Sequence, residues 1–204
     1  MQLPTQSSVT SPAARIPART DLWWAMFHDI LASVYLFLPA GIANMAPVVL
    51  AKIAGEGRPI DGGVTWRGKP LFGAHKTWQG LLGGTVAGVI CFFLQQRLYG
   101  VPLLRSISII DYERTPLAIG LLMGGGALCG DLAKSFFKRR LGIDPGRPWF
   151  PFDQIDYIAG AILFTFPLIP LTAVQAVRVI VTFVVLHLIV SAAGFLLRLK
   201  EQPL

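Results

Sequence analysis

Five long apolar stretches, separated by polar segments, constrain the fold of this chain more than any other feature. They cover residues 30–50, 81–98, 116–132, 155–171 and 177–197. An α-helix needs about 20 residues to cross about 30 Å of hydrocarbon, so each stretch is close to the required length. The mean hydropathy is +0.59 and only 14% of the residues are charged, which is too apolar for an ordinary soluble domain. The sequence predicts an all-α, polytopic integral membrane protein with about five transmembrane helices.

The beginning of the chain differs in composition from the rest. Residues 1–21 are rich in Ser, Thr, Pro and Ala and contain no apolar run. Such a segment can neither bury a core nor act as a signal sequence. We therefore expect residues 1–21 to form a disordered tail and residues 22–204 to form one membrane-embedded domain.

Lysine and arginine are distributed unevenly between the two sides of the predicted bundle. Twelve fall on the side that carries the loops 52–76 and 134–147 and the C-terminal tail, and six fall on the other side. The positive-inside rule then predicts a multi-pass protein of the cell membrane, with its N-terminus outside and with both charged loops and the C-terminus in the cytoplasm. The formal net charge of +7 favours anionic membrane lipids or nucleotide phosphates as partners. Nucleic acid is not expected, because membrane spans interrupt the basic residues and aromatic interleaving is missing.

Three aspartates lie at the predicted cytoplasmic boundary of the third and fourth stretches. Asp131 shares a helix face with Lys134 and Lys138, and Asp153 and Asp156 are three residues apart. A hard cation such as Mg²⁺ needs only two or three carboxylates when the substrate supplies further oxygen ligands. The three aspartates meet that demand. The alternative is that Asp131 pairs with a lysine of its own helix, and that Asp153 and Asp156 cap the fourth span.

A second polar loop ends in Lys76 and Thr77, directly before the second apolar stretch. The free N–H groups of a helix start, with a lysine beside them, favour phosphate binding. Gly62, Gly63 and Gly73 permit backbone conformations that other residues avoid. The alternative is a solvated loop that ends in a helix cap.

Several catalytic motifs are missing from the sequence. It contains no Gly-x-Ser-x-Gly, no CxxC and no His-Glu-x-x-His pattern, so neither a serine hydrolase nor a thiolate zinc site is supported. A reaction without a protein nucleophile fits better. Attack by a phosphomonoester on the α-phosphate of a nucleoside triphosphate is such a reaction, because it requires mainly positioning and charge neutralisation.

Four motifs carry a resemblance to a known family. They are Arg-Pro-Ile-Asp at 58–61, His-Lys-Thr-Trp-Gln-Gly at 75–80, Gly-Asp-Leu-Ala-Lys-Ser-Phe-Phe-Lys-Arg-Arg at 130–140 and Asp-Gln-Ile-Asp-Tyr at 153–157. With these motifs the chain resembles the CDP-archaeol synthases, a family of membrane cytidylyltransferases that is more distantly related to the CDP-diacylglycerol synthases. The resemblance runs from about residue 31 to residue 197.

This resemblance implies transfer of CMP from CTP to a lipid phosphate, release of pyrophosphate, and Mg²⁺ bound at the cytoplasmic face. It implies metal-binding and catalytic roles for Asp131, Asp153 and Asp156. The residues implied in CTP binding are Lys76, Thr77, Ser135, Lys138 and Arg139.

Three questions stay open at this point. The leading interpretation has an isoprenoid glycerol ether lipid phosphate as the acceptor. Diacyl phosphatidic acid is the alternative, and the apolar stretches do not distinguish the two. A membrane transporter or a packing subunit is the alternative from another class, although no inverted repeat or broken helix pair favours transport. Assembly as a homodimer is a further expectation for which the sequence gives no direct sign.

Overall fold

The computed structural model describes residues 19–145 and 147–196, and this part of the chain is mainly helical. Its elements, in chain order, are α1 (Arg19–Ala54), β1 (Thr65–Trp66), β2 (Lys69–Pro70), α2 (Trp78–Leu98), α3 (Pro102–Ser106), α4 (Ala118–Arg140), α5 (Phe152–Thr165) and α6 (Ala173–Leu196). A mainly helical fold was predicted, and the helical content confirms it. The small antiparallel hairpin β1–β2 was not predicted.

Among the residues that the structure describes, three helices are long and apolar enough to cross a membrane. They lie at Trp23–Ala54, Trp78–Leu98 and Ala173–Ala192. The second half of α4 carries charged residues, and α5 has only 14 residues. The count of five spans therefore stays a prediction.

Two predicted boundaries need correction. The stretch 155–171 was expected to be one span, but α5 ends at Thr165. Pro167 and Pro170 explain the early end, because proline removes a backbone donor and disfavours helix in the residue before it. At the other end of the chain, α1 begins at Arg19, inside the predicted tail, while residues 1–18 lie outside the described residues.

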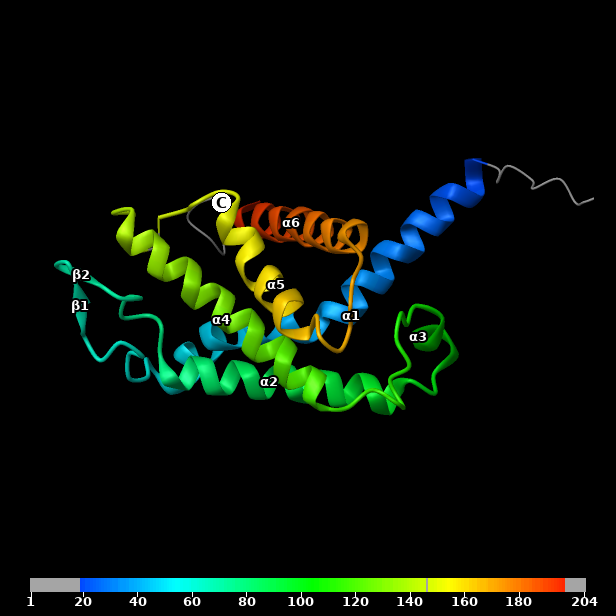
Figure 1. Ribbon diagram of the computed structural model, residues 1–204, viewed down its shortest axis with the longest axis horizontal. Coiled ribbons are helices and arrows are strands. Elements are labelled where there is room, and N and C mark those ends of the chain that lie inside the picture. The colour runs from blue at the N-terminus through cyan, green and yellow to red at the C-terminus, as the bar shows by residue number, and fades with distance from the viewer. Residues whose placement is uncertain (1–18, 146, 197–204) are drawn as a thin grey trace, which may run out of the picture.

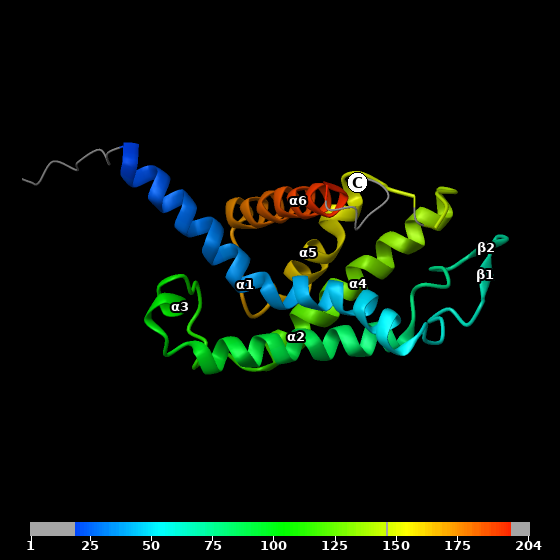
Figure 2. The same ribbon diagram turned by 180° about the vertical axis from the view of Figure 1, so that it is seen from behind.

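The two charged loops lie at the same end of the molecule. Figures 1 and 2 show the β1–β2 hairpin beside the C-terminal end of α4, and α3 at the opposite end of the long axis. Helices α1, α2 and α4 contact one another, α5 packs along α4, and α6 packs on α5 and α1. A shared location for the two loops was predicted from the distribution of basic residues, and this arrangement agrees with it.

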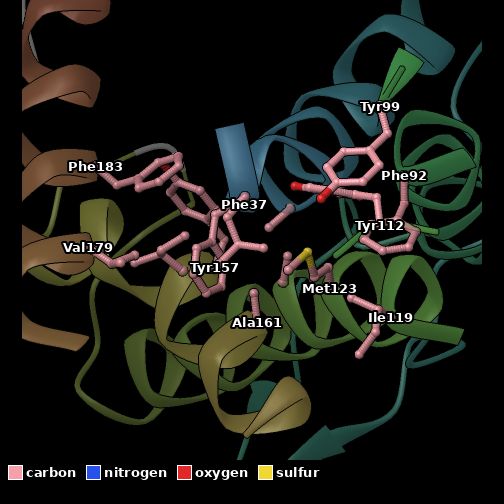
Figure 3. Close-up of a cluster of buried hydrophobic side chains, with 14 residues drawn as sticks. Phe37, Phe92, Tyr99, Tyr112, Ile119, Met123, Tyr157, Ala161, Val179 and Phe183 are labelled. Carbon is pink, nitrogen blue, oxygen red and sulfur yellow. The ribbon is translucent and has the colours of Figure 1, made fainter. Parts of the chain in front are cut away.

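Aromatic and aliphatic side chains from five helices fill the centre of the bundle (Figure 3). Phe37 of α1, Phe92 of α2 and Met123 of α4 are fully buried. On the outside of α2, by contrast, Leu82, Val86 and Ile90 form an exposed apolar stripe at a spacing of four residues. Such a stripe is typical of a helix that faces lipid.

Glycines bring α4 and α5 into direct backbone contact. A Cβ atom at Gly130 would lie only 2.2 Å from the backbone oxygen of Asp156, and one at Gly160 would lie 2.2 Å from that of Gly126. Small residues allow helices to approach this closely. Because Asp131 follows Gly130 directly, the same contact brings Asp131 and Asp156 to one side of the helix pair.

Asp61 organises the loop 57–77. Its Oδ1 accepts a hydrogen bond from the backbone N–H of Gly63, and its Oδ2 accepts from those of Phe72 and Gly73, each at 3.1 Å. Burial alone would raise the pKa of Asp61, but these backbone donors outweigh it and lower the pKa below 3.8. The charged form therefore stabilises the loop above pH 3.8, and this contribution is lost as the pH falls through the lowered pKa.

Candidate active site

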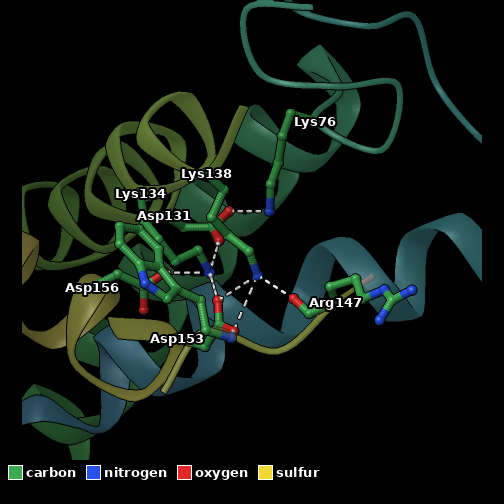
Figure 4. Close-up of polar contacts among 8 residues, drawn as sticks. Lys76, Asp131, Lys134, Lys138, Arg147, Asp153 and Asp156 are labelled. Carbon is green, nitrogen blue, oxygen red and sulfur yellow. Dashed lines mark hydrogen bonds and ion pairs between the residues drawn. The ribbon is translucent and has the colours of Figure 1, made fainter. Parts of the chain in front are cut away.

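Three aspartates surround one lysine at the charged end of the bundle (Figure 4). The Nζ atom of Lys134 lies 3.1 Å from Oδ1 of Asp131, 3.1 Å from Oδ1 of Asp153 and 2.7 Å from Oδ2 of Asp156. The side chain of Asp156 is only 5% exposed and that of Lys134 is 15% exposed. The predicted cluster of three carboxylates is therefore present, but it is arranged around an ammonium group.

Two further lysines complete this lysine–aspartate network. Lys76, at the end of the loop 57–77, forms an ion pair with Oδ2 of Asp131. The Nζ atom of Lys138 lies 3.1 Å from both carboxylate oxygens of Asp153 and donates to the backbone oxygen of Arg147 at 2.5 Å. The network thus ties the start of α2 to α4 and α5, and its three ammonium groups balance its three carboxylates.

The remaining predicted residues, Thr77, Ser135 and Arg139, take no part in these ion pairs. Thr77 caps α2, because its side-chain oxygen accepts a hydrogen bond from the backbone N–H of Gly80 at 3.1 Å. Ser135 and Arg139 are buried on α4. The Nε atom of Arg139 is buried and has no hydrogen-bond partner in the described part of the chain. A buried donor of this kind is available to a ligand oxygen.

The carboxylates fit a hard cation by their chemistry, since Mg²⁺ prefers oxygen ligands. Oδ1 of Asp156 is buried without a hydrogen-bond partner among residues 19–145 and 147–196. A buried acceptor without a donor costs about 1–3 kcal/mol, so this atom is free to accept a ligand. Within the same residues no three acidic, histidine or cysteine side chains share one metal position. The ammonium group of Lys134 lies between the carboxylates instead.

A cleft of about 650 Å³ opens beside the network. Its charged and polar lining includes Lys76, Thr77, Asp131, Lys134 and Asp153. Its apolar lining includes Pro47, Val48, Ala51, Leu81, Leu128 and Leu132. A cleft lined by both charged and apolar residues fits a ligand that has both a phosphate group and a hydrocarbon part.

Comparisons with known proteins show the family of this chain. Residues 26–204 match the family model described as CarS-like, CDP-archaeol synthase. The CDP-archaeol synthase of Pyrococcus furiosus is 35% identical over 177 residues, which cover 86% of this chain and 99% of that protein. The CDP-archaeol synthase of Methanoculleus marisnigri is 38% identical over 173 residues, which cover 81% of this chain and 99% of that protein.

One solved structure is also similar. It is described as an intramembrane enzyme for archaeal membrane lipids biosynthesis. The two structures superpose with a TM-score of 0.65 and are 38% identical in sequence. The match covers 79% of this chain and 93% of that chain. The family match and the relatives together cover most of the sequence and both charged loops. The chain belongs to the CDP-archaeol synthase family.

Proposed function

We propose that this protein is an integral-membrane cytidylyltransferase that transfers CMP from CTP to an isoprenoid glycerol ether lipid phosphate, forming CDP-archaeol and pyrophosphate. Family membership supports this activity. The observation that carries it is the cleft, which is lined both by residues of the lysine–aspartate network and by apolar side chains. Neither phosphatidic acid as the acceptor nor a transporter or packing subunit gains support from the relatives.

In the proposed reaction an oxygen of the lipid phosphate attacks the α-phosphorus of CTP, and the bond from that phosphorus to the pyrophosphate oxygen breaks. No protein nucleophile is needed. Lys76, Lys138 and Arg139 would neutralise nucleotide phosphates, and Thr77 and Ser135 would contact the same nucleotide. The unpartnered Nε atom of Arg139 supports this assignment.

Asp131, Asp153 and Asp156 would hold Mg²⁺, which when bound supplies charge neutralisation for the phosphates. Lys134 also neutralises these carboxylates, through its three ion pairs. The free acceptor on Asp156 supports the assignment, because it gives the cluster an oxygen ligand that no protein donor occupies.

The activity can be tested with purified protein in detergent. We expect labelled CTP and Mg²⁺ to give a CDP-lipid and an equal amount of pyrophosphate with an unsaturated isoprenoid diether phosphate. Phosphatidic acid should give much less product. Product from phosphatidic acid alone would overturn the proposed acceptor, and no product from any lipid phosphate would overturn the proposed reaction.

We further propose five spans, with α4 and α5 completing the bundle, the N-terminus outside, and the active site and C-terminus in the cytoplasm. The uneven distribution of lysine and arginine supports this orientation, and so does the position of both charged loops at one end of the molecule (Figure 1). A cytoplasmic site is also where CTP is available. Assembly as a homodimer remains a prediction.

Single-cysteine labelling tests the orientation. Cys91 and Cys129 are free and would first be replaced by alanine. In intact cells, a cysteine at Ser106 in α3 should react with a membrane-impermeant thiol reagent. A cysteine at Asp144, between α4 and α5, should react only after the cells are opened. The reverse pattern would separate the lysine–aspartate network from CTP and would contradict the proposed function.

A further inference from the structure

Arg140, the last residue of α4, contacts the β1–β2 hairpin. Its guanidinium group donates hydrogen bonds to the backbone oxygens of Trp66 at 2.6 Å, Lys69 at 3.1 Å and Pro70. The same group lies 5.4 Å from the centre of the Trp66 ring and 5.2 Å from that of Phe136. One side chain thus holds both strands of the hairpin against α4.

Aromatic packing reinforces this contact. The rings of Trp66 and Phe136 are stacked, with centroids 5.6 Å apart and planes 24° apart. Phe72, which follows the hairpin, lies 6.4 Å from the same Phe136 ring. The middle of the loop 57–77 therefore packs on the last turns of α4.

The end of the same loop contacts α4 a second time, through the ion pair between Lys76 and Asp131. Asp131 and Arg140 are nine residues apart, which is about 13 Å along a helix. Backbone hydrogen bonds join the beginning of the loop to its end. The N–H of Ile60 donates to the oxygen of Lys76 at 2.7 Å, and that of Trp78 donates to the oxygen of Arg58 at 3.0 Å.

The chain that leaves the hairpin is bonded to Lys76 as well. The N–H of Lys76 donates to the backbone oxygen of Gly73 at 3.0 Å, and Asp61 holds the N–H groups of Phe72 and Gly73. Movement of the hairpin would be transmitted to Lys76 through this segment.

We propose that Arg140 is a positioning residue for the transfer reaction, which fastens the hairpin to α4 and thereby fixes Lys76 opposite Asp131 at the cleft. This inference rests on the proposed function, in which Lys76 contacts the nucleotide. Lysine cannot replace arginine here. The planar guanidinium serves several carbonyl oxygens and stacks on aromatic rings, whereas an ammonium group is a point charge.

The first test needs no CTP. Within the hairpin, trypsin can cut only after Arg67, because Lys69 precedes proline. Arg140→Ala should accelerate this cleavage on the order of tenfold, since several hydrogen bonds to a charged group are lost. Lys69→Ala is the matched control. It removes one charge from the hairpin but keeps the backbone oxygen that Arg140 contacts, so cleavage should stay within about twofold of wild type. Unchanged cleavage in Arg140→Ala would overturn the proposal.

The second test asks whether Arg140 acts through Lys76. Arg140→Ala should raise the KM for CTP on the order of tenfold in the wild-type background, but less than about twofold in Lys76→Ala, because residues that act through one another are not additive. The KM for the lipid phosphate should not change in either background. A tenfold effect that persists in Lys76→Ala would overturn the proposal and place Arg140 in direct contact with the nucleotide.

Arg140→Lys serves as the second variant if the alanine variant does not fold, and we expect the same faster cleavage and the same dependence on Lys76. Full activity and wild-type cleavage in Arg140→Lys would also overturn the proposal. The two hypotheses fail separately. Lack of CMP transfer by the wild-type protein overturns the proposed function, whereas this inference is decided by the ratios between variants and by cleavage after Arg67.

Discussion

Asp153→Asn is expected to lower kcat for CMP transfer by at least about 100-fold while the protein stays folded and inserted in the membrane. The carboxylate of Asp153 contacts both Lys134 and Lys138. In the proposed function it is also a ligand of the cation that neutralises the phosphates. A 100-fold loss corresponds to about 2.7 kcal/mol of transition-state stabilisation, which is typical for the removal of one such electrostatic contact.

The measurement is the initial rate of CDP-lipid formation at saturating CTP, with the thermal unfolding midpoint as the test of folding. Asp144→Asn is the matched control, because Asp144 is an exposed aspartate between the same two helices. Its rate should stay within about twofold of wild type. If the rate of Asp153→Asn also stayed within about twofold of wild type, the assignment of this carboxylate to the active site would be wrong.

Lys134→Met should destabilise the protein by about 3–5 kcal/mol when divalent cations are removed with EDTA. The change leaves three carboxylates close together without the ammonium group that they share. Because a cation that binds only the folded state stabilises it, millimolar Mg²⁺ should restore part of the loss in this variant. The unfolding midpoint in EDTA measures the loss of stability, and the midpoint in Mg²⁺ measures how much of that loss is restored.

Arg178→Met is the control for Lys134→Met. Arg178 also forms an ion pair between two helices, with Asp29, but both side chains are more than 40% exposed. Exposed pairs contribute about 0–1 kcal/mol, so this variant should lose little stability and show no response to Mg²⁺. Equal losses in the two variants, or a Lys134→Met protein that ignores Mg²⁺, would contradict the role assigned to the carboxylate cluster.

The mainly helical fold can be predicted from the sequence alone, because it depends on local patterns of apolar residues. The roles of the three aspartates stay a prediction. The role of Lys134 does not follow from such patterns. Its pairing with Asp131 is visible from their spacing, but its contacts with Asp153 and Asp156 depend on how closely α4 and α5 pack. Gly130 and Gly160 determine that distance.

The contacts of the basic residues at the end of α4 also cannot be predicted from local sequence patterns. Residues 138, 139 and 140 have similar chemistry in the sequence, yet successive residues of a helix point about 100° apart. Lys138 therefore contacts Asp153, whereas Arg140 contacts the hairpin. The helix register separates a residue of the charged network from one that holds a loop.

The hairpin itself gives only a weak signal in the sequence. Each strand has two residues, too few for an alternating pattern. Its turn has positive φ angles at Arg67 and Gly68, 53° and 73°. This is the conformation of a type I′ turn, for which Asn-Gly is the usual signal and Arg-Gly is not.

The backbone contact between α4 and α5 has a consequence for how this enzyme can adapt to different membranes. The spacing of the acidic residues is fixed by main-chain atoms at Gly130 and Gly160, in the interior of the bundle. The surface toward lipid is formed by other residues, such as Leu82 and Ile90. Substitutions on that outer surface can follow changes in bilayer thickness or fluidity while the distances between reacting groups stay the same. The residues that set the spacing of the reacting groups are thus different from the residues that contact lipid.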